Sequence, residues 1–563
     1  MGADVSRRGF LGGVGAVSAG AALGGLAGAA GRAEAAEALG DGTPQGGEPQ
    51  DGAPDAAAAG ERVGPDDPRY QTLSQGFNQR WTSEPRYIEL IRDELSAVAA
   101  VDRVLAAGLR PTVRGGGHCY EDFVENTGGA ILDLSLMRGV RAGADKYLRP
   151  AYVVEGGATN WDVYTTLFRE FGRTVPAGSC YSVGAGGHIC GGGYGLLSRR
   201  HGLTVDHLVQ VDMVTVRNGF AQVVRAHRAD PPGSDTAELF WAHTGGGGGN
   251  FGLILRYYFA DTIPEPPAQV WLGSAAFPWD GLTEADFGRL VRNYGAFFAA
   301  HSSPGEEVYQ GLFTLLKLSH RAAGELAVTC QWDGADPTPL DAFFRTLEEG
   351  LSVRSTVPTR SLAGPALPFP EKRRRMPWLQ ATQTLNGSGP NQRGKYKSAY
   401  HRKPFTDAEI AACWRWLTTD VPGADMSQTL LQVDSYGCRV NAVEPSATAV
   451  PQRDSILKLQ YQTYWTDPAE DDLHLAYLCD FYRDVYAATG GVPEVSDAAH
   501  DRGTDGCYVN YPDVDLGLAT DPSPAYPRLY YKDGYPRLQQ VKRTWDPHNV
   551  FHHGQSVQLP AAP

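Results

Sequence analysis

The sequence predicts an α+β protein made of two domains and a separate C-terminal segment, residues 501–563. The chain has 563 residues, which is more than one hydrophobic core normally holds. Residues 66–260 alternate short β-branched strands with helical patterns and glycine-rich turns, which is typical of mixed sheets and helices. Residues 261–500 have longer apolar strands and amphipathic helices, which predict an antiparallel sheet covered by helices.

The order of elements follows from apolar spacing. In the first region this spacing predicts one helix over 88–109. Short β-branched runs there predict the strands Pro111–Arg114, Ala130–Leu134, Tyr152–Glu155, Val209–Val216 and Gly252–Tyr258. The later regions contain the predicted strands Ser274–Phe277, Gln310–Leu318, Glu325–Trp332 and Ile456–Tyr461, and the predicted helices Asp341–Leu351, Asp407–Leu417 and Arg537–Trp545.

The N-terminus reads as an export signal over residues 1–36. Ser6–Leu11 contains a twin-arginine pattern, a weakly apolar run follows to Ala30, and Ala33–Ala35 gives a small-residue cleavage site. The alternative, a membrane anchor, is disfavoured because the run is rich in glycine and poor in leucine. We therefore predict a protein secreted by the twin-arginine route and cleaved near Ala35. Residues 37–65 are rich in Gly, Pro, Ala and Asp and predict a disordered leader.

Composition excludes several classes of function. Acidic residues number 64 and basic residues 50, which gives a net charge of −14. Nucleic acids and anionic membranes need a basic surface, so neither is expected as a partner. The eight cysteines include no C-x-x-C pair, and His188 has no partner at ligand spacing, so no metal site is predicted. The pairing of the cysteines and the oligomeric state stay open.

Three glycine-rich loops carry the functional signal. Glycine lets backbone N–H groups approach a phosphate closely, so three such loops in one region predict a large phosphate-bearing ligand. None matches the P-loop pattern, and none forms a dinucleotide-binding strand–G-x-G-x-x-G–helix unit. The loops are Arg114–Tyr120, Gly178–Gly195 and Thr244–Gly252.

These loops also carry a resemblance. The motifs R-G-G-G-H-x-Y, G-x-C-x-x-V-G-x-G-G-H and W-A-H-T-G-G-G-G-G-N-F-G, with Tyr508–Asp513 and Asp546–Phe551, resemble berberine bridge enzyme-like flavin oxidases. That family belongs to the vanillyl-alcohol-oxidase superfamily and includes actinomycete natural-product tailoring oxidases. The resemblance spans roughly residues 66–560. It implies a PCMH-type FAD-binding domain at 66–260, a substrate-binding domain at 261–500, and a segment 501–563 returning to the FAD domain.

The resemblance implies FAD bound covalently at two points. His118 matches the histidine bonded to the flavin 8α-methyl group, and Cys180 matches the cysteine bonded to flavin C6. The alternatives are an ordinary loop histidine and a buried thiol or disulfide partner. Further residues expected at the cofactor are Arg114, Gly115, Gly116, Gly117, Val183, Gly184, Gly187, His188, Gly192, Tyr194, Gly248, Asn250, Gly252, Tyr508 and Asn510.

A phenol is the expected base. By resemblance Tyr511 takes the hydroxyl proton of the substrate while a hydride passes to flavin N5, and Tyr508, three residues earlier, lies nearby. A bend near Asn510 is expected, since strand alternation would place these two tyrosines on opposite faces. An ordinary tyrosine has a pKa near 10, so Lys458 or Arg114 is expected to stabilise the phenolate. The alternative for Tyr511 is an aromatic residue at the core edge.

Strand alternation places Lys458 and Gln460 on the same face. The resemblance points this pair at the flavin and places Tyr120 and Tyr194 in the same pocket. In the bridge-forming members of that family a glutamate base stands at the position of Gln460. Since glutamine cannot abstract a proton, the resemblance disfavours C–C bridge formation here and favours alcohol oxidation. The alternative for Lys458 is a solvated strand charge.

The predicted function is oxidation of an alcohol on a glycosylated or polyketide natural product to an aldehyde, acid or ketone. The resemblance also implies the electron acceptor: in that family a small residue three positions after the flavin-linked cysteine leaves room for dioxygen, so Val183 implies hydrogen peroxide as by-product. Alternatives are an oligosaccharide oxidase acting at the anomeric carbon, an antibiotic-binding flavoprotein without turnover, and a dehydrogenase with another acceptor. Two-electron and four-electron oxidation both stay open.

Overall fold

The computed structural model describes residues 60–358, 372–387, 389–497 and 501–561. The predicted export signal and residues 37–59 of the predicted leader lie outside this part of the chain. Residues 60–65 contradict the leader prediction, because β1 (Glu61–Val63) pairs antiparallel with β2 (Tyr87–Leu90). Val63 is fully buried against neighbouring apolar side chains of the same sheet, and that burial fixes the segment.

The first sheet has the strand order β1-β2-β4-β3, with β3 at Pro111–Arg114 and β4 at Ala130–Asp133. The predicted helix over 88–109 is wrong at its start, since β2 pairs in parallel with β4. Helix α2 (Glu94–Ala106) begins only after Asp93, whose side chain accepts a hydrogen bond from the Ser96 N–H and caps the helix. Partner strands far along the chain therefore overrode the local helical periodicity.

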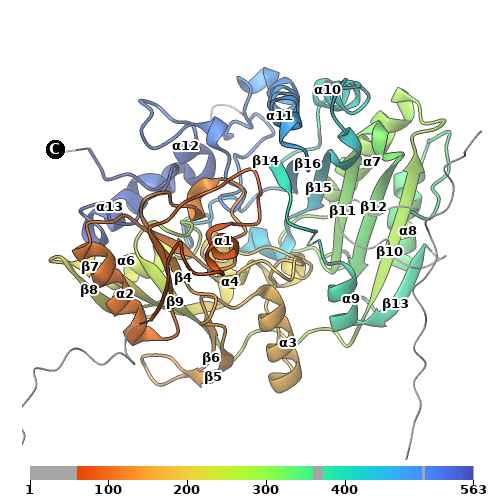
Figure 1. Ribbon diagram of the computed structural model, residues 1–563. Helices are drawn as coiled ribbons and strands as arrows, with labels where there is room; N and C mark the ends of the chain where they lie inside the picture. The colour runs from red at the N-terminus through yellow and green to blue at the C-terminus, as the bar shows by residue number, and fades with distance from the viewer. Residues whose placement is uncertain (1–59, 359–371, 388, 498–500, 562–563) are drawn as a thin grey trace, which may run out of the picture. The chain divides into compact units, whose positions relative to one another are not determined.

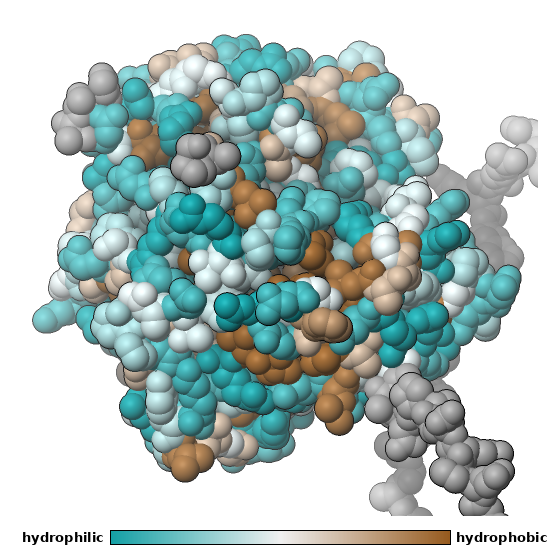
Figure 2. Space-filling view, turned by 90° about the vertical axis from the view of Figure 1, so that its left-hand side faces the viewer, coloured by the Kyte–Doolittle hydropathy of each residue, from teal (hydrophilic) through white to brown (hydrophobic). Residues whose placement is uncertain are grey.

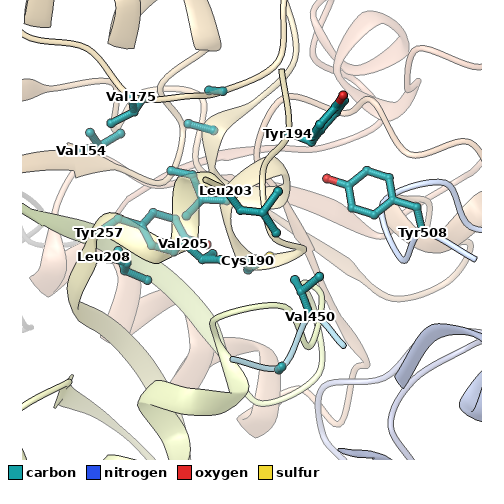
Figure 3. Close-up of a cluster of buried hydrophobic side chains, with 14 of the residues drawn as sticks. Val154, Val175, Cys190, Tyr194, Leu203, Val205, Leu208, Tyr257, Val450 and Tyr508 are labelled. Atoms are coloured by element: carbon teal, nitrogen blue, oxygen red, sulfur yellow. The ribbon is translucent and has the colours of Figure 1, made fainter. Parts of the chain in front are cut away.

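An antiparallel five-stranded sheet follows, with the strand order β5-β6-β9-β7-β8. Its strands are β5 (Val140–Ala144), β6 (Pro150–Glu155), β7 (Leu208–Arg217), β8 (Phe220–His227) and β9 (Leu253–Ala260). The helices of this region are α1 (Tyr70–Ser74), α3 (Asn160–Phe171), α4 (Ala185–Cys190), α5 (Ser198–His201) and α6 (Asp235–Ala242). The buried cluster around α4 reaches Tyr194 and Tyr508 at its edge (Figure 3).

The second region contains a seven-stranded antiparallel sheet, which confirms the prediction. Its order is β13 (Arg373–Pro377), β10 (Gln269–Pro278), β12 (Glu325–Trp332), β11 (Leu312–Ser319), β15 (Leu430–Ser435), β16 (Leu457–Trp465) and β14 (Arg393–His401). The helices that pack on one face of it are α7 (Glu284–Ala300), α8 (Thr338–Glu348), α10 (Asp407–Leu417) and α11 (Asp471–Val485), as Figure 1 shows. Helix α9 (Trp378–Thr384) follows β13.

The C-terminal segment lies against the first region. Helix α13 (Tyr535–Trp545), which follows α12 (Tyr526–Tyr531), lies near α6 in Figure 1, and the Trp545 indole N–H donates to the Asp235 carbonyl at 3.1 Å. Short 3₁₀ helices complete the described chain at Asp122–Val124, Thr204–His207, Arg321–Ala323, Met426–Gln428, Cys438–Ala442, Pro468–Glu470, Ala487–Thr489, Val514–Leu516 and Lys532–Gly534. The domain boundaries themselves remain predictions.

The surface in Figure 2 is mostly hydrophilic, with hydrophobic residues gathered in small groups near its centre. Large exposed hydrophobic side chains include Leu95, Leu148 and Phe220, which come from separate elements. Among the described residues, no helix combines the length and apolar character that a membrane crossing requires.

Candidate active site and cofactor cavity

A cavity of about 410 Å³ lies between the three glycine-rich loops and one face of the seven-stranded sheet. Alternate residues of β11, β12, β15 and β16 point toward the helices, and the residues between them line the cavity. One side of the cavity is therefore mainly backbone and the other mainly side chains. Residues of the C-terminal segment, including Tyr511, complete its lining.

The first two glycine loops touch each other backbone to backbone. A Cβ added to Gly116 would lie 2.4 Å from the Gly184 nitrogen, and one added to Gly186 would lie 2.4 Å from the Gly156 oxygen. Gly117 has φ +67°, a left-handed conformation that side chains disfavour. Because only hydrogen fits at these positions, backbone N–H groups reach the cavity surface, as a phosphate-bearing ligand requires.

The second and third loops are held by hydrogen bonds from buried side chains. The Gly178 N–H donates to His188 Nε2 at 2.9 Å, and burial lowers the pKa of His188 to about 4, so its ring is a neutral acceptor. Asn510 donates to the His188 carbonyl at 3.0 Å. Asn250 donates to the Gly246 carbonyl at 3.0 Å and closes the third loop. His188 thus has a structural role, since its ring and its carbonyl both hold the second loop.

His118 and Cys180 both line the cavity. His118 stacks on Phe77 with ring centroids 4.5 Å apart, and burial lowers the pKa of its imidazole to about 4. A ring nitrogen of His118 therefore keeps its lone pair at neutral pH. Gly387 covers Cys180 so closely that an added Cβ would lie 3.0 Å from the sulfur. The eight cysteines, all in the described part of the chain, form no disulfide.

Two of the predicted cofactor residues do not line the cavity. The Arg114 guanidinium pairs with Asp133 at 2.8 Å and donates to the Leu73 carbonyl. It is therefore tied to the first sheet, which contradicts its predicted role beside the phenol. Gly192 faces Val450, whose Cγ2 would lie 2.8 Å from an added Cβ. The others line the cavity: Gly115, Gly116, Gly117, Val183, Gly184, Gly187, His188, Tyr194, Gly248, Asn250, Gly252, Tyr508 and Asn510.

Tyr508 and Tyr511 lie in a turn, where the Tyr511 N–H donates to the Tyr508 carbonyl at 2.9 Å. The expected bend is thus present as a turn, and it brings the two rings to a centroid distance of 5.0 Å. Burial raises the pKa of Tyr511 well above 10, and the charge of Asp434 raises it further. The ammonium of Lys458 lies 3.0 Å from the Tyr511 hydroxyl and is the counter-charge that a phenolate needs.

Lys458 joins Tyr511 to a buried carboxylate. Its Nζ lies 3.1 Å from Asp434 Oδ2, and its ammonium lies 4.2 Å from the Tyr511 ring centroid and 5.2 Å from that of Tyr194. The Tyr194 hydroxyl donates to the Ser435 carbonyl. The side chains Asp434, Lys458 and Tyr511 form one continuous polar line. The phenol oxygen of Tyr511 therefore lies beside an ordered pair of opposite charges.

Gln460 lies on the same face as Lys458, as alternation predicts, and donates to the Tyr120 hydroxyl at 2.7 Å. Tyr120 stacks on Tyr396 at a centroid distance of 3.6 Å, and burial raises its pKa well above 10. Gln462 donates to Gln460 at 2.9 Å. Tyr120 is therefore a fixed neutral phenol held by a chain of amides.

A buried charge cluster supports these aromatic residues. Lys395 on β14 contacts Glu121 at 3.1 Å and Asp513 at 2.8 Å, while Lys397 contacts Asp513 at 2.8 Å and Asp515 at 2.5 Å. Glu121 follows Tyr120, Asp513 follows Tyr511 by two residues, and Tyr396 lies between the lysines. The cluster therefore links the first glycine loop, the large sheet and the C-terminal segment beside the candidate base.

Sequence reasoning missed Asp434 and the charge cluster. Asp434 lies opposite Lys458 in the register of β15 and β16, so a correct strand pairing would have placed the two side by side. The residues of the cluster come from three distant segments, and no local pattern marks them. The sequence offered one signal for these residues, the alternation of side chains along each strand. Alternation predicts which residues of a strand share a face, but not which residues of the neighbouring strand lie opposite them.

Comparison with known proteins defines the class. The model of the FAD binding domain matches residues 85–225, and the model described as berberine and berberine like matches residues 507–558. The chain is 40% identical over 532 residues to the aclacinomycin-N/aclacinomycin-A oxidase of Streptomyces galilaeus, covering 90% of this chain and 92% of that protein. It is 39% identical to the hexose oxidase of Chondrus crispus, covering 87% and 93%.

Solved structures also match this chain over most of its length. The crystal structure of a glycopeptide hexose oxidase complexed with teicoplanin matches with a TM-score of 0.79 and 38% identity, covering 89% of this chain and 99% of that chain. The fold and cavity therefore define a PCMH-type FAD-dependent oxidoreductase. The chain belongs to the berberine bridge enzyme-like family of FAD-linked oxidases.

The residues present fit FAD. Gly116 and Gly184 pack so closely that neither position has room for a Cβ. Because no side chain covers the backbone there, its N–H groups stay available for phosphate oxygens. The neutral imidazole of His118 and the sulfur of Cys180 open on the same cavity as Tyr511. These three side chains would therefore all be within the space that FAD occupies.

Proposed function

We propose that this protein oxidises an alcohol of a glycosylated or polyketide natural product to an aldehyde, acid or ketone. The observation that carries this proposal is the line Asp434–Lys458–Tyr511, which opens on a cavity that fits FAD. The named relatives support the substrate class, since they act on aclacinomycin or on hexoses, or hold a glycopeptide.

The proton step belongs to Tyr511. Tyr511 acts as the phenolate: its oxygen takes the hydroxyl proton of the substrate and becomes a neutral phenol, and the Lys458 ammonium, 3.0 Å away, stabilises the phenolate before this step. Asp434 holds the Lys458 ammonium in place. When bound, FAD supplies the two-electron oxidation by accepting a hydride. The buried walls of the cavity exclude bulk water, which strengthens each of these electrostatic contacts.

We propose further that His118 and Cys180 hold FAD covalently at two points. Neutral imidazole and sulfur are the nucleophiles that such bonds require, and the lowered pKa of His118 keeps its ring unprotonated. Val183 lines the cavity, and its small side chain leaves room for dioxygen as acceptor, with hydrogen peroxide as product. Export through the twin-arginine signal remains our proposal for localisation, tested by finding the cleaved chain in culture medium.

A second candidate function is oxidation of free hexoses or oligosaccharides at the anomeric carbon. The 39% identity to a hexose oxidase favours it. Peroxide release separates the candidates when lactose, a cello-oligosaccharide and a panel of glycosylated polyketides and glycopeptides are compared. The proposed function predicts turnover of a member of the natural-product panel at a kcat/KM at least ~10-fold above that of the free sugars. Faster turnover of the free sugars would establish the second candidate instead.

A further inference from the structure

A lysine on the substrate side of the cavity has no role in the chemistry above. Lys317 lies near the end of β11, opposite Ala327 of β12 and Gln432 of β15. It lines the cavity together with Phe313 and Leu315 of the same strand. The position is central in the seven-stranded sheet, on the face that Lys458 and Gln460 share.

Lys317 has no direct charge partner in the described part of the chain. Within the described residues it makes no hydrogen bond or ion pair, whereas Lys395, Lys397 and Lys458 each contact a carboxylate. A half-buried ammonium without a partner is costly, since it has lost part of its hydration and gained nothing in return. Lys317 is therefore a cation that lines the cavity without a direct partner.

Two carboxylates line the same cavity, Asp434 and Glu325, and neither forms an ion pair with Lys317. Asp434 accepts from Lys458 at 3.1 Å through Oδ2 and from Gln432 at 2.9 Å through Oδ1. Burial lowers the pKa of Lys317, and the negative charges that counter this effect belong to Cys180 and Asp434. Cys180 has no negative charge when its sulfur is bonded to carbon. The strand register gives its place: Lys317 lies opposite Gln432, and Asp434 lies two residues further along β15 on the same cavity face.

We propose that Lys317 is a cationic anchor for a carboxylate of the substrate. The inference rests on the proposed function and names its substrate class: an alcohol that also carries a carboxylate, which binds at Lys317 while the carbinol lies beside Tyr511. A carboxylate fits better than a hydroxyl, because only an anion neutralises the ammonium as the cavity closes around the ligand. The other polar groups of this wall, Gln432, Gln460 and Gln462, already bond one another or their neighbours.

Binding of benzoate tests the anchor without turnover. Calorimetric titration of the FAD-loaded protein compares benzoate with the neutral benzamide, in wild type, Lys317→Met and Lys317→Arg. Leu315→Met, two residues away on the same wall, is the matched control. We expect Lys317→Met to weaken benzoate binding ~10–100-fold, the range for loss of a charge-assisted hydrogen bond. Lys317→Arg should restore binding to within a few-fold, and benzamide affinity should not change.

Two results overturn the anchor: equal benzoate affinity in wild type and Lys317→Met, or no benzoate binding to wild type. Anaerobic flavin reduction then separates this inference from the function it rests on. An aryl glycoside with a carboxylate on the ring is compared with its neutral carboxamide, and the preference should vanish in Lys317→Met. If neither these glycosides nor the natural-product panel reduces the flavin, the proposed function fails, while the titration still decides the anchor.

Discussion

The two sides of the cavity are built by different means. The cofactor side consists of glycine backbone with neutral side chains such as His118 and His188, and it is ordered by contacts too close for any Cβ. The substrate side consists of side chains on one face of a sheet, with lysines and carboxylates in defined pairs. On the cofactor side, main-chain N–H groups are the groups available to a ligand, and a side chain added at the closely packed glycines would push the loops apart. The substrate side can be altered one side chain at a time, so specificity is expected to reside there.

The largest effect is expected from filling the glycine contact. In Gly184→Val the new Cβ would lie 2.3 Å from the Gly116 nitrogen, so the two loops must separate. We expect no FAD-loaded protein, measured as flavin absorbance per chain. Gly305→Val is the control, since nothing lies within 4 Å of its Cβ position and Gly305 does not line the cavity. Normal FAD loading of Gly184→Val would show that the backbone contact is unimportant.

On the substrate side, Tyr511→Phe should remove the base and leave the cofactor side intact. Turnover is expected to fall ~10²–10⁴-fold, the range for loss of general-base catalysis. Flavin content should not change, because the phenol ring and its packing remain. Anaerobic flavin reduction by stopped flow measures the effect, with Tyr464→Phe as a cavity-lining control. Unchanged reduction in Tyr511→Phe removes this residue from the proposed step.

The charge pair behind Tyr511 should set the pH dependence of flavin reduction. Asp434 raises the pKa of Tyr511, so Asp434→Asn should move the rising limb of the rate profile to lower pH. Lys458→Met removes the neighbouring cation and should move that limb to higher pH. Opposite shifts of about one pH unit are the expected result. Shifts in the same direction, or none, would contradict the line Asp434–Lys458–Tyr511.

A smaller effect is expected from acid on the cofactor side. Burial lowers the pKa of His188 to about 4 and that of His553 to about 3, against about 6.5 in the unfolded chain. The unfolded state therefore binds more protons below pH 6.5, and stability is lost as pH falls toward 4. Asp505, whose pKa burial raises to about 6, acts in the opposite direction. The midpoint of thermal unfolding should be lower at pH 5 than at pH 7, and a higher midpoint at pH 5 would contradict this balance.

The same contrast explains what the sequence could predict. Strand Pro111–Arg114 and helix Asp407–Leu417 agree with the structure, because local patterns and a capping threonine define them. The glycine loops were visible because contiguous residues form them. The prediction of a helix over 88–109 was wrong at its start, because β2 forms by pairing with β4, which lies more than forty residues away in the chain. Asp434, Lys317 and Lys395 escaped notice because their neighbours are set by strand register, which a single sequence does not reveal.

The central claim is that FAD is fixed to the cofactor side at His118 and Cys180, opposite the phenol of Tyr511. The most direct test is the intact mass of the denatured protein, compared with that of a His118→Ala, Cys180→Ala double variant. Beyond the two substitutions, wild type should be heavier by the mass of one FAD. A yellow native protein whose denatured chain carries no added mass would contradict the claim.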